Sequence, residues 1–145
     1  LTRNMRICID SCVLICGLQE RASDCGRLLE LISPDVNVII PRLIAQEVSR
    51  NLTSTAQRQA FYRLFYQRAF AVIVDLPIPR ELVNKYVNLG LREKADAFIG
   101  AFAELAQVHY LISINRHFLK ELAPSSFEVI DPRTFMKQWR QHPEL

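Results

Sequence analysis

The stretch MRICIDSCVLI, residues 5–15, decides the fold. Its apolar beginning is typical of a buried strand, and Asp10 stands where that strand would end. A carboxylate among apolar side chains needs a partner, because an unpaired buried charge is costly and tends to take up a proton. The role of Asp10 is therefore the first question that the sequence raises.

Short apolar runs alternate with longer segments of helical period along the chain. The predicted strands are residues 6–9, 36–40, 70–74, 110–114 and 127–130. The predicted helices are residues 20–32, 42–51, 54–68, 79–89, 93–108 and 132–140. Strands that alternate with helices indicate a parallel sheet covered on both faces. The sequence thus predicts an α/β fold, a three-layer α/β/α sandwich whose central parallel sheet has 4–5 strands.

The composition is that of a globular domain. The chain has 145 residues, of which 50% are hydrophobic and 23% charged, so a disordered or fibrous class is excluded. The formal net charge of +3 is compatible with an anionic partner without requiring one. No apolar run reaches the ~18 residues of a membrane-spanning helix. We expect a single cytoplasmic domain over residues 1–145 with no membrane partner, in which residues 1–4 are an irregular leader or a cloning remnant.

The cysteines are not spaced as a metal site. None forms a C-x-x-C pair, and the histidines lie far downstream without zinc-type spacing. We expect reduced thiols rather than a disulfide framework, since the chain is too rich in core residues to need one. The four cysteines are Cys8, Cys12, Cys16 and Cys25.

Two polar side chains stand at the ends of predicted strands. Asp10 ends the first strand, and Asn115 ends the strand YLISI, residues 110–114. Ligands of open parallel sheets bind beyond the carboxyl ends of the strands. We therefore expect a site at this edge.

Two predicted helices add acidic side chains. Glu47 lies beside the apolar stripe of its helix, and Asp96 lies near a helix start among small residues. Each also has a purely structural explanation: Glu47 can be a solvated helical acid, and Asp96 can favour the helix dipole. In the predicted helix at residues 93–108, the apolar stripe expected to face inward is Phe98, Phe102 and Leu105, with Ala101 and Val108 filling it.

Four blocks of the chain, in order, resemble the motif blocks of PIN-domain nucleases. They are ICIDSCVLI, VIIPRLIAQEVSR, GLREKADAFIGAFAE and YLISINRHF, and the resemblance extends from about residue 5 to residue 135. Within that family the chain looks most like the VapC-type toxins and their stand-alone relatives.

The resemblance implies a metal site for Mg²⁺ or Mn²⁺ at the sheet edge. Its ligands would be Asp10, Glu47 and Asp96, with Asn115 at a fourth position where many family members carry Asp, and Ser11 at the usual Ser/Thr position. Asn115 can offer a carbonyl oxygen to a hard cation but brings no charge. Three clustered carboxylates repel one another, and a shared cation relieves that repulsion.

The activity that the resemblance implies is metal-dependent hydrolysis of RNA phosphodiester bonds, as the toxin of a type II toxin–antitoxin pair. Arg116 and Lys94, which neighbour the site positions, and Ser11 are the expected phosphate contacts. His117 could assist proton transfer, but a lone histidine is more often structural. The helix at residues 54–68 is dense in aromatic residues, which indicates deep burial or an interface. In VapC-like proteins the early helices form a homodimer and an antitoxin groove, so we expect a homodimer and an antitoxin's C-terminal tail as a second partner.

Two other interpretations stay open. Asn115 makes a non-cleaving PIN-like module that binds RNA or protein the main alternative. A receiver-like phosphoryl-transfer domain would need an acidic pair around the first strand, and the neighbours of Asp10 are Ile9 and Ser11. Metal binding separates the nuclease from the binding module.

Overall fold

The computed structural model describes residues 4–67, 69–122 and 126–141. The expected leader at residues 1–4 therefore lies outside the described residues except for Asn4, as does residue 68 of the predicted helix 54–68. The strands are β1 (Met5–Ile9), β2 (Val36–Pro41), β3 (Ala71–Val74), β4 (Tyr110–Ile112) and β5 (Glu128–Ile130). The helices are α1 (Ser11–Gln19), α2 (Asp24–Glu30), α3 (Arg42–Asn51), α4 (Thr55–Tyr66), α5 (Arg80–Asn88), α6 (Lys94–Leu105), the π-helix η1 (His117–Glu121) and α7 (Pro132–Gln141).

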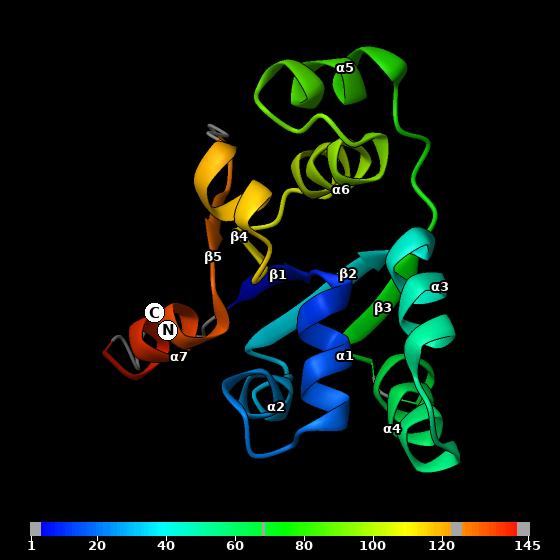
Figure 1. The fold of residues 1–145 in the computed structure, drawn as a ribbon. Coiled ribbons are helices and arrows are strands. Elements are labelled where there is room, and N and C mark those ends of the chain that lie inside the picture. The colour runs from blue at the N-terminus through cyan, green and yellow to red at the C-terminus, as the bar shows by residue number, and fades with distance from the viewer. Residues whose placement is uncertain (1–3, 68, 123–125, 142–145) are drawn as a thin grey trace.

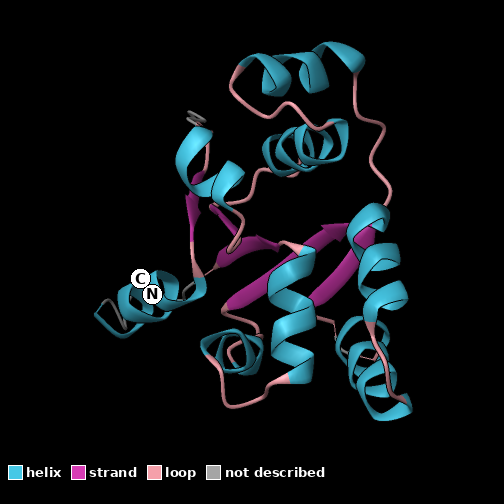
Figure 2. Ribbon diagram, in the orientation of Figure 1, coloured by secondary structure: helices cyan, strands magenta, loops and turns pink. Residues whose placement is uncertain are grey.

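The five strands form one parallel sheet in the order β3-β2-β1-β4-β5. Helices lie on both sides of it, so the predicted three-layer α/β/α fold is confirmed (Figures 1 and 2). The chain first runs from β1 to β2 and β3, and then returns to place β4 on the other side of β1. The strand order therefore reverses between β1 and β4, where ligands bind in open α/β sheets.

The central strand β1 is held from both sides and buried throughout its second half. Ile7, Cys8 and Ile9 have no exposed surface, and Ile7 pairs with Val38 of β2 and with Tyr110 of β4. The Asp10 N–H continues this ladder by donating to the Ile112 carbonyl at 2.9 Å. The backbone of Asp10 is thus fixed at the sheet edge by the buried strand that precedes it.

The first helix differs from the prediction. Residues 20–32 were expected to be the first helix, but α1 occupies residues 11–19 and α2 only residues 24–30. Helix α1 begins where Asp10 accepts a hydrogen bond from Ser11 N–H, which is the geometry of an N-cap. Its buried positions include Ser11, Val13 and Leu14, so no simple amphipathic stripe marks it in the sequence.

The expected inward stripe of α6 is wrong in part. Phe102 is fully buried, but the Leu105 side chain is 40% exposed and Phe98 only half-buried. Ala101 is fully buried as expected, Ala97 is fully buried as well, and α6 packs beneath α5 (Figure 1). A Cβ added to Gly100 would lie 2.7 Å from Cδ1 of Tyr86 in α5, so this glycine permits the close approach of the two helices.

The thiols agree with the expectation of reduced cysteines. All four are free, with Cys8 and Cys25 buried and Cys12 and Cys16 half-buried. Within the residues that the structure describes, no helix is both long and apolar enough to cross a membrane.

Candidate functional site

The four acidic and amide side chains singled out in the sequence meet in one cleft of about 320 Å³. Asp10 comes directly after β1, and Asn115 follows β4. Glu47 lies in α3, which starts immediately after β2, and Asp96 lies in the first turn of α6. Four separate segments therefore deliver oxygen-bearing side chains to the switch point of the sheet. Among the residues that the structure describes, the lining is Asp10, Ser11, Cys12, Glu47, Ala95, Asp96, Ile99, Ile114 and Asn115.

Asp10 is the most buried member, with 4% of its surface exposed. Its Oδ1 accepts a hydrogen bond from Ser11 N–H at 2.8 Å. Its Oδ2 accepts from Ser113 Oγ at 2.8 Å and from Cys12 Sγ at 3.4 Å. Burial raises the pKa of the Asp10 carboxyl, these three hydrogen bonds oppose the rise, and the negative charge of Glu47 adds to it.

Ser113 is a site residue that the sequence reasoning missed. It has no exposed surface, donates to Asp10, and accepts a hydrogen bond from Asn115 N–H at 2.9 Å. One buried hydroxyl therefore connects the ends of β1 and β4. The signal in the sequence was a single polar residue within the apolar run YLISI, two positions before Asn115.

Cys12 lines the cleft although it was not among the expected site residues. Burial and the neighbouring charge of Asp10 raise the pKa of its thiol to about 11. The thiol is therefore protonated at neutral pH and donates to the Asp10 carboxylate rather than acting as a nucleophile.

Asp96 and Glu47 are half-buried across the cleft from Asp10. Burial raises the pKa of the Asp96 carboxyl first, and the negative charges of Asp10, Glu93 and Glu47 raise it further, while His117 lowers it. Among the described residues no hydrogen bond reaches the carboxylate of either Asp96 or Glu47. The cleft thus concentrates negative charge that the surrounding protein neutralises only in part.

Asn115 is held by the element that follows it. Its Oδ1 accepts a hydrogen bond from His117 N–H at 2.9 Å, at the start of η1. The same oxygen retains a second lone pair, because a carbonyl can accept two hydrogen bonds.

Of the three expected phosphate contacts, one lines the cleft and two lie beside it. Ser11 lines the cleft, but its N–H already donates to Asp10. Lys94 and Arg116 are exposed neighbours of the lining residues Ala95 and Asn115 and do not line the cleft themselves.

The donor set of the cleft suits a hard divalent cation in its chemistry. Carboxylate and amide oxygens are the ligands that Mg²⁺ and Mn²⁺ take in proteins, and a cation relieves repulsion between clustered acids. In the described part of the chain, however, no three His, Cys, Asp or Glu side chains are grouped closely enough to hold a metal ion as they stand. The acids line the same cleft without forming a closed coordination sphere.

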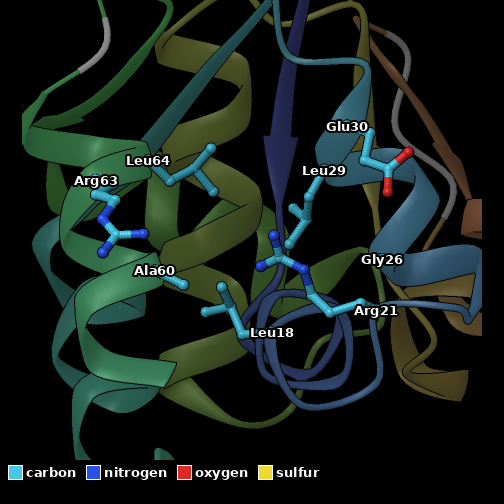
Figure 3. A pocket seen from close by; sticks show the side chains of 8 residues that line it. All are labelled: Leu18, Arg21, Gly26, Leu29, Glu30, Ala60, Arg63 and Leu64. Carbon is cyan, nitrogen blue, oxygen red and sulfur yellow. The ribbon is translucent and has the colours of Figure 1, made fainter. Parts of the chain in front are cut away.

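A second hollow, of about 170 Å³, lies between α1, α2 and α4 (Figure 3). Its walls are mainly apolar, with Leu18, Leu29 and Leu64 among them, and charged groups come from Arg21, Glu30 and Arg63. A single carboxylate does not form a cation site, so this hollow is not the candidate active site.

Comparison with known proteins shows similarity of fold. No protein-family model matches the chain, and no curated protein matches it either. Among solved structures, the chain is similar to one in the crystal structure of VapBC2 from Rickettsia felis bound to a DNA fragment from the promoter. The TM-score is 0.59 and the identity 14%, over 88% of this chain and 98% of that chain. The two proteins therefore share a fold.

Proposed function

We propose that this protein is a metal-dependent endoribonuclease and the toxin of a type II toxin–antitoxin pair. The observation that carries the proposal is the convergence of Asp10, Glu47, Asp96 and Asn115 on one cleft at the switch point of the sheet. Clustered acids with raised pKa values in a cleft are typical of functional sites.

The fold supports the toxin assignment. Its likeness to a chain of the VapBC2 structure covers nearly all of that chain, and the four sequence blocks that resemble VapC-type toxins contain all four site positions. On this proposal the partners are an RNA substrate, a second copy of the chain and an antitoxin.

The cation, Mg²⁺ or Mn²⁺, would be held by the carboxylates of Glu47, Asp96 and Asp10 and the side-chain carbonyl of Asn115. When bound, it would supply activation of a water and stabilisation of the oxygen that leaves phosphorus. Asp10 is fixed by its hydrogen bonds and acts as the rigid member of the set. Glu47 and Asp96, whose carboxylates accept no hydrogen bond from the described residues, would adjust toward it.

Apolar and basic side chains of the protein lie in and beside the cleft. Ile99 and Ile114 line the cleft beside the acids and give it apolar walls. Lys94 and Arg116 lie exposed next to the lining residues and would attract the phosphate backbone of the substrate.

Cleavage of a labelled structured RNA in Mn²⁺ or Mg²⁺ tests the proposal. We expect products from the wild-type protein and none in EDTA or with Asp96→Asn. The matched control is Glu30→Gln, an exposed acid of α2 outside the cleft, which should leave cleavage intact. Products of equal yield in EDTA or with Asp96→Asn would show that the cleft is not responsible.

The alternative function is that of a non-cleaving module that binds RNA or protein. The observation that favours it is Asn115, which brings no charge to the site and already accepts a hydrogen bond from His117 N–H. A folded protein that binds RNA without cleaving it or binding Mn²⁺ would support this alternative.

A further inference from the structure

Helix α4 carries a pair of tyrosines on its exposed face. Tyr62 and Tyr66 are 53% and 61% exposed, and their rings stack with centroids 5.0 Å apart and an interplanar angle of 17°. Phe61 and Phe65, by contrast, are buried against the core. The aromatic density of this helix thus divides into a buried face that stabilises the fold and an exposed face that no described residue covers.

Two hollows border the tyrosine pair, and both are basic. One of about 660 Å³ is lined by Tyr66 together with Arg42 and Arg50. The other, of about 490 Å³, is lined by Tyr62 together with Arg58 and Arg63. No acidic side chain lines either hollow within the described residues.

Few acidic side chains lie near this surface: Asp75 pairs with Arg42, and Glu30 lines the hollow between α1, α2 and α4 together with Arg63. Between Glu47 and Asp75 the sequence contains no Asp or Glu. Arg42 pairs with Asp75, but neither Arg50 nor Arg63 makes a hydrogen bond or ion pair with a described residue. These two guanidinium groups are therefore available to an anionic partner.

This surface and the candidate active site share helix α3. Glu47 lines the acidic cleft, while Arg50, one turn later, lines the hollow beside Tyr66. A chain that crosses α3 from the cleft would reach the hollow of Arg50 and Tyr66, and Tyr62, Arg58 and Arg63 line the other hollow beside the tyrosine pair. We name this surface, made of Arg50, Tyr66, Tyr62, Arg58 and Arg63, the tyrosine track.

We propose that the tyrosine track binds single-stranded RNA that extends from the cleft, which rests on the proposed nuclease function and names its substrate class. Bases stack on the exposed rings of Tyr62 and Tyr66, and the arginines bind the phosphates between them. Aromatic side chains within a basic groove are typical of single-strand binding, because an unpaired base offers its whole face for stacking. A duplex keeps those faces in its own stack.

RNA fits this surface better than a second copy of the chain does. In a two-fold dimer the same patch meets itself, so the three arginines of one copy would meet a patch of the other copy that contains three arginines and no acid. A polyanion removes this repulsion. Stacking on tyrosine also uses the exposed ring faces without requiring the apolar surroundings of a protein–protein core.

Fluorescence anisotropy with a labelled single-stranded RNA of about 12 nucleotides, a length that spans a typical single-strand site, tests the proposal. EDTA is present throughout, so that binding is measured without cleavage. The variants are Tyr62→Ala/Tyr66→Ala, the ring-preserving Tyr62→Phe/Tyr66→Phe, and Arg50→Ala/Arg63→Ala. Arg133→Ala is the charge control, because it is exposed on α7, on the other side of the molecule from α4 (Figure 1).

We expect the alanine pair to weaken binding about tenfold or more, and the phenylalanine pair to keep wild-type affinity, since stacking needs only the ring. Arg50→Ala/Arg63→Ala should weaken binding and reduce its salt dependence, with Arg133→Ala unchanged. Duplex RNA of equal length should bind more weakly than the single strand. Thermal melting of each variant confirms that these exposed substitutions leave the fold intact.

Unchanged RNA affinity in the alanine pair would overturn the proposal. If the same pair also converted a dimer into a monomer in light scattering, the surface would be an interface between copies of the chain. The outcome is separable from that of the nuclease test. If the wild type cleaves RNA and the alanine pair binds RNA as tightly as the wild type, the nuclease proposal holds and the tyrosine track is ruled out. If the alanine pair loses binding but the wild type does not cleave RNA, the tyrosine track holds and the nuclease proposal is ruled out.

Discussion

Ser113 Oγ donates a hydrogen bond of 2.8 Å to Oδ2 of Asp10, across 103 positions of sequence. Both side chains are buried, and they join the ends of the adjacent strands β4 and β1. Because Ser113 also accepts from Asn115 N–H, one hydroxyl fixes the positions of two candidate ligands. Ser113 is therefore a positioning residue of the cleft.

Replacing Ser113 by alanine should lower both stability and cation affinity. The substitution leaves Oδ2 of a buried carboxylate without its closest donor, and hydrogen bonds to charged groups contribute about 1.5–3 kcal/mol. We expect urea unfolding to show a loss of about 2 kcal/mol and Mn²⁺ titration to show weaker binding. Ser49→Ala, at an exposed serine of α3, is the control for stability. Wild-type Mn²⁺ affinity in Ser113→Ala would show that Ser113 does not position the site.

Replacing Asp96 by asparagine should stabilise the protein at neutral pH while abolishing cleavage. Burial and the charges of Asp10, Glu93 and Glu47 raise the pKa of Asp96, so its ionised form is disfavoured in the folded state. The asparagine side chain has nearly the same shape as aspartate, and its neutral amide avoids the free-energy cost of an ionised carboxylate at this position. We therefore expect a higher unfolding free energy for Asp96→Asn than for the wild type at pH 7.

The sign of the pH dependence follows from the same raised pKa. Between the unfolded pKa of an Asp carboxyl, about 4, and its higher folded value, the folded state binds more protons than the unfolded state. The contribution of Asp96 to stability therefore decreases as pH rises through this window. Urea unfolding should show that the advantage of Asp96→Asn grows as pH rises above about 4 and levels off above the folded pKa of Asp96. An advantage that is constant or shrinks with rising pH would contradict this account.

Replacing Gly100 by alanine should destabilise the contact between α5 and α6. The new Cβ would lie 2.7 Å from Cδ1 and 3.1 Å from Cγ of Tyr86, whose ring is fully buried. Overpacking of this kind costs about 1–3 kcal/mol, which outweighs the higher helix propensity of alanine. Thermal unfolding measures the loss of stability. A Gly100→Ala variant at least as stable as the wild type would show that the Tyr86 ring moves to accommodate the new Cβ at little cost.

Replacing Arg116 or Lys94 by alanine should weaken RNA binding without preventing it. Both side chains are exposed beside the cleft rather than in it, so each is expected to bind one phosphate. The slope of log affinity against log salt should fall by about 0.7 for each phosphate that the variant no longer neutralises. Anisotropy titrations at several salt concentrations measure this slope. A slope identical to that of the wild type would assign phosphate binding to other residues.

The sheet was predictable because its strands are short β-branched runs between turn signals. The runs at residues 36–40 and 70–74 became β2 and β3 almost to the residue. The run at residues 110–114 extends past its strand, since β4 ends at Ile112 and Ile114 is 48% exposed. A single apolar residue such as Ile114 near a strand end does not show, in the sequence, whether hydrogen bonding to the neighbouring strand continues to that residue.

Helix α1 could not be recognised by periodicity, because its buried residues do not follow a single stripe. The one sign of a helix start was Asp10 followed by Ser11, because Asp is a common N-cap residue. Asp10 was interpreted only as a metal ligand. Asp10 in fact does both, since the Oδ1 that caps the helix belongs to the carboxylate that faces the cleft.

The acids of the cleft could be singled out because Asp10 stands at a strand end and Asp96 near a helix start, and the resemblance to PIN-domain nucleases added Glu47 to them as one predicted site. Ser113 could not be singled out, because its importance comes from a hydrogen bond to Asp10, and only the parallel pairing of β1 with β4 brings the two together. The split of the α4 aromatics into buried and exposed faces likewise depends on tertiary packing. A helix with aromatic residues nearly all round gives no such division.

Titration of the folded protein with Mn²⁺, followed by calorimetry, tests the central claim most directly. The claim predicts saturable binding by the wild type and by Glu30→Gln, and its loss in Asp10→Asn, Glu47→Gln and Asp96→Asn. Circular dichroism confirms that each variant is folded. Equal Mn²⁺ binding in the wild type and the three cleft variants, or none in the folded wild type, would contradict the claim that these acids form a shared cation site.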